Sequence, residues 1–209
     1  MTIAGLIAAA GLSTRMGRPK ALLPVGGSSV PFVLQLATVF VEAGLAPLII
    51  TVPEGELGAL VTSVLRPLAA HADSTILCVP NDFPQSGLSG SVLTALAHVG
   101  DAAGLVFTPV DAPHASVSLL NALVQGLLTT TAAAVVPVVA ARWGHPVAFR
   151  HTAWRRLASC AHQGGPRTVL DEYADAGQLH QLSWPDPRVL DDINSVADWE
   201  RVFGLALPG

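Results

Sequence analysis

Short apolar runs alternate with amphipathic segments along this chain, and that alternation constrains its fold more than any other feature. Four of the runs predict buried strands: Ile3–Ala9, Pro47–Val52, Thr75–Val79 and Gly104–Thr108. The segments between them predict helices over Pro31–Ala43, Leu57–Ala70 and Ser91–Val99. Strands buried on both faces have such continuous apolar sequences, and strands joined by helices form parallel sheets. We therefore predict an α/β fold with a mostly parallel central sheet that helices cover on both faces.

The second half of the chain continues this alternation. We expect helices over Ser116–Leu128, Thr152–Ser159, Arg167–Ala174 and Val196–Phe203, strands over Ala132–Val139 and Leu179–Trp184, and extended backbone over 140–150. Pro67 is expected to end its helix early, because proline removes a helical hydrogen bond and its ring meets the preceding turn. A length of 209 residues fits one domain, which we take to be 1–209.

Composition excludes several classes of protein. Hydrophobic residues make up 51% of the chain and charged residues 12%, which is too apolar for a disordered protein. The net charge of −4 provides no basic field for nucleic acid. The apolar stretch Ile3–Ala8 is far shorter than the roughly 20 residues that span a bilayer, and no basic segment precedes it as in a secretory signal. We expect a soluble, cytoplasmic protein with neither nucleic acid nor membrane as a partner.

A glycine- and cation-rich loop follows the first predicted strand. It reads Ala10-Gly11-Leu12-Ser13-Thr14-Arg15-Met16-Gly17-Arg18-Pro19-Lys20 and holds three of the chain's 11 lysine and arginine residues. Glycine lets a backbone approach a ligand closely, and successive N–H groups in such a turn bind anions. The spacing matches neither a Walker A loop nor a Gly-x-Gly-x-x-Gly fingerprint. The loop indicates a phosphate site, and the alternative is a surface turn with solvated cations.

The pattern Ala-Gly-x-Ser-x-Arg-Met-Gly-x-x-Lys resembles the signature of the MobA-like nucleotidyltransferases, most closely the branch that contains molybdenum cofactor cytidylyltransferase. Further segments match in the family's order: Ala21–Pro24, Gly87–Ser91, Asp111–Pro113, Gly144–Pro146 and Asp192–Asn194. The resemblance implies a three-layer α/β/α, Rossmann-like nucleotidyltransferase fold. It also implies Mg²⁺-dependent transfer of CMP from CTP to molybdopterin or its molybdenum form, with release of pyrophosphate.

The resemblance carries the metal-binding role to Asp111 and Asp192, with Mg²⁺ as the ion and Mn²⁺ as a possible substitute. Lys20 and Arg15 would stabilise charge on the triphosphate, so the catalytic set is Lys20, Arg15 and Asp111. Asp111 could instead serve a turn, because Asp is common there. Asp191 competes with Asp192 as the second ligand, and Asn194 or Ser195 could cap the last helix. The family often has Gly-Asp-Gln-Pro where this chain has Val110–Pro113, which leaves the acceptor less certain than the metal site.

The predicted nucleotide-binding residues come from two loops: Ala10, Gly11, Ser13, Gly17, Asn81, Ser89 and Ser91. Asn81 offers both a donor and an acceptor, as the edge of a nucleobase requires. Ser89 could instead cap the helix that follows. By resemblance, His145 and Arg167 lie on the side of the phosphate acceptor. The alternatives are a structural histidine and an arginine in the first turn of its helix.

Other activities are open on the same fold. Guanylyl transfer to the same cofactor and nucleotidyl transfer to sugar phosphates keep the chemistry and change a substrate. A non-catalytic nucleotide-binding chaperone of the cofactor is a third possibility, against which the joint presence of Lys20, Arg15 and Asp111 argues. The expected partners are a nucleoside triphosphate, with CTP favoured, and a molybdopterin-type phosphate acceptor. A molybdoenzyme could receive the finished cofactor.

Overall fold

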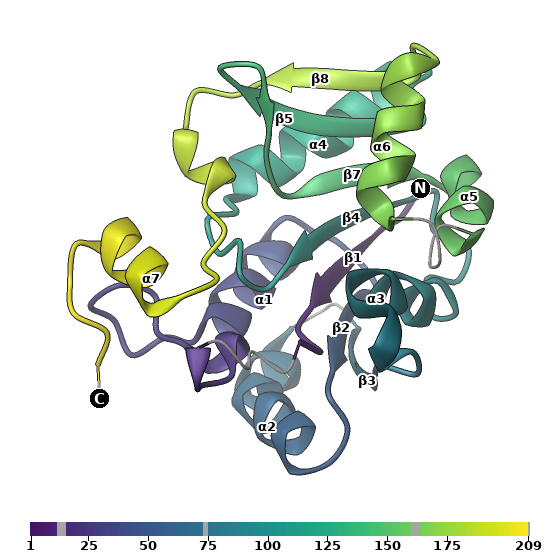
Figure 1. The fold of residues 1–209 in the computed structure, drawn as a ribbon. Coiled ribbons are helices and arrows are strands. Elements are labelled where there is room, and N and C mark those ends of the chain that lie inside the picture. The colour runs from purple at the N-terminus through teal and green to yellow at the C-terminus, as the bar shows by residue number, and fades with distance from the viewer. Residues whose placement is uncertain (12–15, 73–74, 160–163, 209) are drawn as a thin grey trace.

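An eight-stranded sheet organises the chain (Figure 1). The computed structural model describes residues 1–11, 16–72, 75–159 and 164–208, so the predicted site residues Ser13 and Arg15 lie outside the described residues. The strands are β1 (Ile3–Ala8), β2 (Leu48–Val52), β3 (Ile76–Pro80), β4 (Gly104–Pro109), β5 (Ala134–Val139), β6 (Arg142–Trp143), β7 (Val147–Arg150) and β8 (Leu179–Ser183). Their order is β3-β2-β1-β4-β7-β5-β6, and β8 pairs with β5.

Most of the sheet is parallel, as predicted. β1 pairs in parallel with β2 and β4, and β2 with β3, while β7 runs antiparallel between β4 and β5. The chain moves outward from β1 through β2 to β3 and then returns to β4 on the other side of β1. This reversal is the topological switch point, where open α/β sheets bind ligands beyond the carboxyl ends of their strands.

Helices cover both faces of the sheet, which confirms the three-layer α/β/α fold. They are α1 (Phe32–Glu42), α2 (Glu56–His71), α3 (Gly87–Leu96), α4 (Val117–Thr129), α5 (Trp154–Ser159), α6 (Pro166–Asp175) and α7 (Val196–Phe203). Buried residues of α1, α2, α4 and α7 form one core, and those of α3, α5 and α6 form the other.

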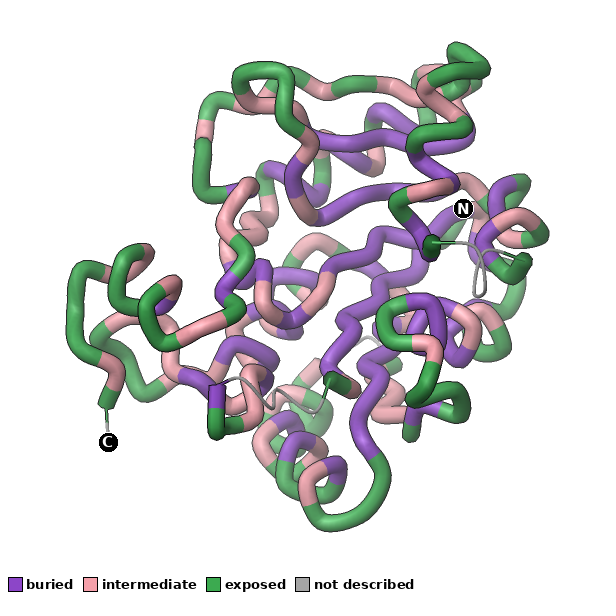
Figure 2. The backbone as a smooth tube through the Cα atoms, viewed as in Figure 1, coloured by how far each residue is buried: buried purple, intermediate pink, exposed green. Residues whose placement is uncertain are grey.

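The side chains of β1 show how the central strands serve both cores. Ile3 and Ile7 pack in the first core, and Ala4, Leu6 and Ala8 pack in the second. Every residue of β1 is buried, which explains its continuous apolar sequence (Figure 2).

Two helices differ from the prediction. α2 continues through Pro67 to His71: Leu68, beyond the proline, still packs against the core that buries Val61 and Leu65, and the carbonyl that Pro67 leaves without a partner belongs to exposed Ser63. α3 begins at Gly87, after a 3₁₀ turn at Pro84–Ser86, rather than at Ser91. Within the described residues, no helix is long and apolar enough to cross a membrane.

Candidate active site

A cavity of about 690 Å³ opens at the switch point, beyond the carboxyl ends of β1 to β4. The segment that follows each of these four strands lines the cavity. The lining residues are Ala8, Ala10, Gly11, Lys20, Pro53, Glu54, Asn81, Pro84, Gly87, Leu88, Ser91, Pro109, Val110, Asp111 and Asn194. The predicted phosphate loop, the predicted base loop and the predicted metal ligand Asp111 therefore meet in one place.

A lysine between two oxygen acceptors forms the polar side of this cavity. Lys20 Nζ donates to Asp111 Oδ2 at 2.6 Å and to Asn194 Oδ1 at 2.7 Å. Lys20 begins a short 3₁₀ turn after the glycine-rich loop, Asp111 follows β4, and Asn194 precedes α7. The lysine and aspartate side chains are 15% and 22% exposed, so the pair is partly shielded while remaining open to a ligand.

A backbone hydrogen bond links the segment before α7 to the turn that follows β4. The backbone N–H of fully buried Ile193 donates to the carbonyl of Asp111 at 2.9 Å. This bond brings Asp192 next to Asp111. Partial removal of the Asp192 carboxylate from water, followed by the negative charge of Asp111, raises the pKa of Asp192 above its ordinary value, and Lys20 opposes this effect. The two carboxylates thus share one small region with Lys20, and Arg142 adds a second positive charge near Asp192.

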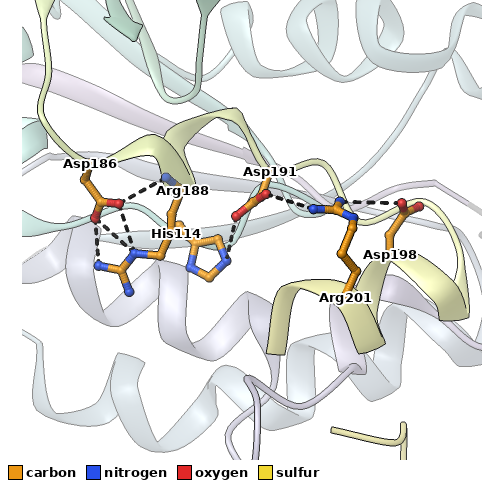
Figure 3. A network of polar contacts seen from close by, with 6 residues as sticks. All are labelled: His114, Asp186, Arg188, Asp191, Asp198 and Arg201. Atoms are coloured by element: carbon orange, nitrogen blue, oxygen red, sulfur yellow. Dashed lines mark hydrogen bonds and ion pairs between the residues drawn. The ribbon is translucent and has the colours of Figure 1, made fainter. Parts of the chain in front are cut away.

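Asp191 points elsewhere (Figure 3). Its carboxylate lies 3.7 Å from His114 Nε2 and 3.5 Å from Arg201 Nη1, and Arg201 also contacts Asp198. These contacts tie the 190–194 segment to α7. Asp191 is thereby engaged in a structural network, and Asp192 is the carboxylate that lies with Asp111.

The predicted nucleotide-binding residues are only partly brought together. Ala10, Gly11, Asn81 and Ser91 line the cavity. Gly17 has the positive φ expected of the loop, +63°, without being among the lining residues. Ser89 lies inside α3 rather than at its cap, and a β-carbon on Gly165 would come within 2.9 Å of its Oγ, so Ser89 faces α6.

Most of the chain matches the model of one known family. The model of the MobA-like NTP transferase domain matches residues 5–177. The chain belongs to the MobA-like NTP transferase family. It is 25% identical over 198 residues to the probable molybdenum cofactor guanylyltransferase of Mycobacterium tuberculosis H37Rv, covering 93% of this chain and 90% of the relative.

Solved structures share the fold of this chain. The crystal structure of Rv0371c from Mycobacterium tuberculosis H37Rv superposes with a TM-score of 0.77 at 26% identity, covering 98% of this chain and 99% of the other. A manganese complex of the same protein gives a TM-score of 0.70 at 24% identity, covering 98% and 99%. Membership of the MobA-like family makes the chain a nucleotidyltransferase, and the nucleotide that it uses is a separate question.

Asp192 lines a second cavity, of about 630 Å³, in this MobA-like transferase. The β5–β6 turn, α6 and the segment before α7 enclose it. Its lining residues are Ala141, Arg142, Trp143, Arg167, Asp171, Ala174, Asp175, Leu190 and Asp192. Arg167 stacks over the Trp143 ring at 4.4 Å and donates to Asp171 at 3.1 Å. The predicted acceptor residue Arg167 thus lies in a cavity next to the carboxylate pair.

The other predicted acceptor residue, His145, is not among the residues that line either cavity. Its ring lies edge-on to Phe107 at 6.2 Å between centroids. Burial lowers the pKa of His145 to about 4, although the charge of Asp111 opposes the change, so the imidazole is neutral at pH 7. Within the described residues, its Nδ1 is buried with no hydrogen-bond partner. His145 is thus buried and neutral, and its position on the side of the acceptor stays a prediction.

Some lining residues were not predicted from the sequence. The sequence offers Asn194 as a possible helix cap. In the structure Ser195 caps α7 in a reciprocal capping box with Asp198, and Asn194 contacts Lys20. The sequence signal for this arrangement was the Ser-x-x-Asp spacing, which assigns the cap to Ser195 and leaves Asn194 available. No sequence pattern marks Arg142 and Trp143 as site residues. They reach the second cavity through the short antiparallel turn that joins β5 to β6.

Proposed function

We propose that this chain transfers a nucleoside monophosphate from a nucleoside triphosphate to the phosphate of a molybdopterin-type cofactor, with release of pyrophosphate. One observation carries the proposal: Lys20, Asp111 and Asn194 form a polar cluster in the first cavity, and Asp192, two residues before Asn194, lines the second. A triphosphate in the first cavity and a phosphate acceptor in the second would bring their reacting atoms to this cluster.

The first cavity suits a nucleotide. Pro53, Pro84 and Leu88 provide apolar walls for a base, and Gly11 and Lys20 lie where the phosphates would be held. The name of the mycobacterial relative favours GTP, whereas the motif resemblance favours CTP, and both stay within the proposal.

Asp111 and Asp192 fit a divalent ion. Burial is the main cause of the raised pKa of Asp192 and the charge of Asp111 adds to it, so a cation held by both carboxylates would favour their ionised forms. Within the described residues no group of three or more His, Cys, Asp or Glu side chains could hold a metal, but Mg²⁺ commonly binds through one or two carboxylates and the substrate phosphates. The manganese complex of the mycobacterial protein supports a divalent ion, either Mg²⁺ or Mn²⁺.

The residues then have separate tasks. An oxygen of the acceptor phosphate attacks the α-phosphorus, the new P–O bond forms, and the bond to the leaving pyrophosphate breaks. Lys20 stabilises the negative charge of the triphosphate, and Asn194 and Asp111 hold the ammonium in position. A phosphate acceptor is already anionic at neutral pH, so the reaction needs no general base. A bound divalent ion would neutralise charge on the phosphates.

The second cavity would hold the acceptor. Arg142 and Arg167 supply cations for its phosphate, and Trp143 supplies an aromatic face beside Arg167. His145 is neutral and lines neither cavity, so we assign the charge that meets the acceptor phosphate to the two arginines.

Pyrophosphate release tests the proposal. Purified protein with Mg²⁺ and molybdopterin is given GTP, CTP, ATP or UTP, and pyrophosphate is measured with and without the acceptor. We expect acceptor-dependent release with GTP or CTP. Stabilisation of the protein by a nucleotide without any turnover would instead indicate a cofactor chaperone, and failure of every nucleotide to bind would refute the proposal.

A further inference from the structure

Trp199 in α7 forms a hydrogen bond with the segment that follows Lys20. Its indole Nε1–H donates to the carbonyl of Pro24 at 2.9 Å. The side chain is fully buried, so this carbonyl replaces the water to which the N–H group would otherwise be bonded. The bond joins two segments that lie 175 residues apart in the sequence and side by side in the fold (Figure 1). It therefore helps to determine where the segment after Lys20 lies relative to α7.

Hydrogen bonds hold the backbone between Lys20 and Pro24 in one conformation. A 3₁₀ turn covers Lys20–Leu22, and the N–H of Leu23 donates to the carbonyl of Lys20 at 3.1 Å. The carbonyl of Leu23 in turn accepts the N–H of Phe32, at the start of α1, at 2.8 Å. A segment that is bonded within itself in this way moves as a unit, so a shift at Pro24 also moves Lys20.

The ammonium group of the same lysine is bonded to the other end of this region of α7. Lys20 Nζ donates to Asn194 Oδ1 at 2.7 Å, and Asn194 lies just before the helix. The capping box that Ser195 forms holds the first turn of α7, which keeps the two contacts at a constant separation. Lys20 is thus linked to α7 twice, through its backbone by Trp199 and Pro24 and through its ammonium by Asn194.

Ring contacts surround the indole and leave its N–H group as the directional contact. The ring of Trp199 lies 4.9 Å from that of Phe203, and Phe203 lies 6.1 Å from Phe32 in α1. A β-carbon on Gly26 would lie 3.3 Å from Phe203, so the loop after Pro24 also packs closely on α7. Apolar packing is non-directional, whereas a hydrogen bond depends on distance and angle. The N–H group can therefore set the position of the Lys20 turn where packing alone would let it shift.

We propose, on the basis of the proposed function, that Trp199 is a positioning residue for nucleotidyl transfer, because its indole N–H holds the Lys20 turn where the ammonium meets both Asp111 and Asn194. An error of about 1 Å in the placement of a reacting group can lower a rate by about 100-fold. A long lysine side chain can still reach the triphosphate in the ground state when its turn shifts, but the transition state requires exact placement. Loss of the N–H group should therefore lower kcat more than it weakens nucleotide binding.

Replacement of the indole nitrogen alone tests this role. Site-specific Trp199→3-benzothienylalanine puts sulfur in place of the N–H group and keeps the shape of the ring. We expect kcat to fall about tenfold while KM for the nucleotide changes by less than about twofold. The same replacement at Trp154 is the matched control, because its buried Nε1 has no hydrogen-bond partner among the described residues. Both constants should stay near native in that control. Trp199→Phe also lacks the N–H group and repeats the test should the analogue fail to fold.

A residue that acts through Lys20 should lose its effect when Lys20 is absent. In the Lys20→Met background we expect the Trp199 replacement to change kcat by less than about twofold. Melting temperatures check that each variant is folded. A tenfold loss that persists without Lys20, or a lower melting temperature with kcat unchanged, overturns the inference, since either result would mean that Trp199 supports the fold and not the lysine.

The ammonium group can also be observed without turnover. Lys20 is the only lysine, so lysine labelled with ¹⁵N gives a single side-chain ammonium signal. Exchange of its protons with water should be about fivefold faster after the Trp199 replacement, because the bonds to Asp111 and Asn194 open more often, and unchanged in the Trp154 control. Equal exchange rates in native protein and Trp199 variant overturn the inference. If the native protein releases no pyrophosphate, the proposed function fails, and the exchange rate alone decides whether Trp199 positions Lys20.

Discussion

Lys20 Nζ lies 2.6 Å from Asp111 Oδ2, although 91 residues separate the two along the chain. The glycine-rich loop after β1 and the turn after β4 meet because β1 and β4 are neighbours in the sheet. The parallel sheet thus brings together two motifs that are far apart in the sequence, and their side chains form an ion pair that lines the first cavity.

Lys20 is the only lysine in the sequence, which makes it a direct chemical reporter. We expect Mg²⁺ and the cognate nucleoside triphosphate to protect it from an amine-specific reagent, as followed by mass spectrometry. Lys20→Met should lower the rate of transfer by about 100-fold or more, because charge stabilisation in the transition state is lost. Arg18→Met is the matched control: its guanidinium contacts the Pro208 carbonyl at the surface, and its rate should stay near native. Equal losses in both variants would contradict a specific role for Lys20.

The fold was largely predictable from the sequence because buried parallel strands are continuous apolar runs. β1 and β4 need apolar side chains on both faces, and their bounds agree with the prediction to within one residue. The predictions failed where packing overrides local preference. α2 passes through Pro67 because Leu68, beyond it, still packs against the core, and α3 starts early because Gly90 allows its first turn to lie against the 81–83 loop.

The two neighbouring aspartates before α7 make a matched pair of variants. Asp192→Asn should lower the transfer rate by about 100-fold, because it removes a carboxylate that would hold the divalent ion beside Asp111. Asp191→Asn should keep a rate close to native and cost about 1 kcal/mol or less of stability, since its contacts to His114 and Arg201 are long and partly exposed. Rates at several Mg²⁺ concentrations and urea unfolding check both. A larger loss of activity in the Asp191 variant would reverse the assignment.

Substitutions of the adjacent residues Asn194 and Ser195 should distinguish an effect on catalysis from an effect on stability. Asn194→Ala removes an acceptor of Lys20 and should slow transfer about tenfold with little change in unfolding free energy. Ser195→Ala breaks the capping box of α7 and should cost about 1 kcal/mol of stability. Steady-state kinetics and urea unfolding of both variants give the comparison. The assignment is wrong if Asn194→Ala is the less stable variant and turns over at the native rate.

The site was predictable where residue type alone defines the chemistry. Lys20 and Asp111 stand at strand ends in a pattern that indicates phosphate and metal binding, and the structure places them together. The sequence could not show that the Asn81 oxygen is used inside the protein, because that depends on Thr94, which reaches it from the opposite side of a turn. Nor could it show that Asp191 is occupied by a contact with α7.

His145 gives a prediction about pH. Its pKa falls from 6.5 in the unfolded chain to about 4 in the folded protein, so the unfolded state binds a proton more tightly between these values. The stability due to neutral His145 is complete above pH 6.5 and is lost as the pH falls toward 4, by roughly 3 kcal/mol in total at 1.36 kcal/mol per pKa unit.

His145→Leu has no imidazole to protonate, and the buried Nδ1 that it removes has no partner among the described residues. The stability difference between native protein and variant, measured by urea unfolding at pH 7 and pH 5, should therefore shift toward the variant at pH 5. The other histidines are present in both proteins and cancel in this difference. A difference that is independent of pH would show that the His145 imidazole is not desolvated in solution, and a cationic role toward the acceptor would then become tenable.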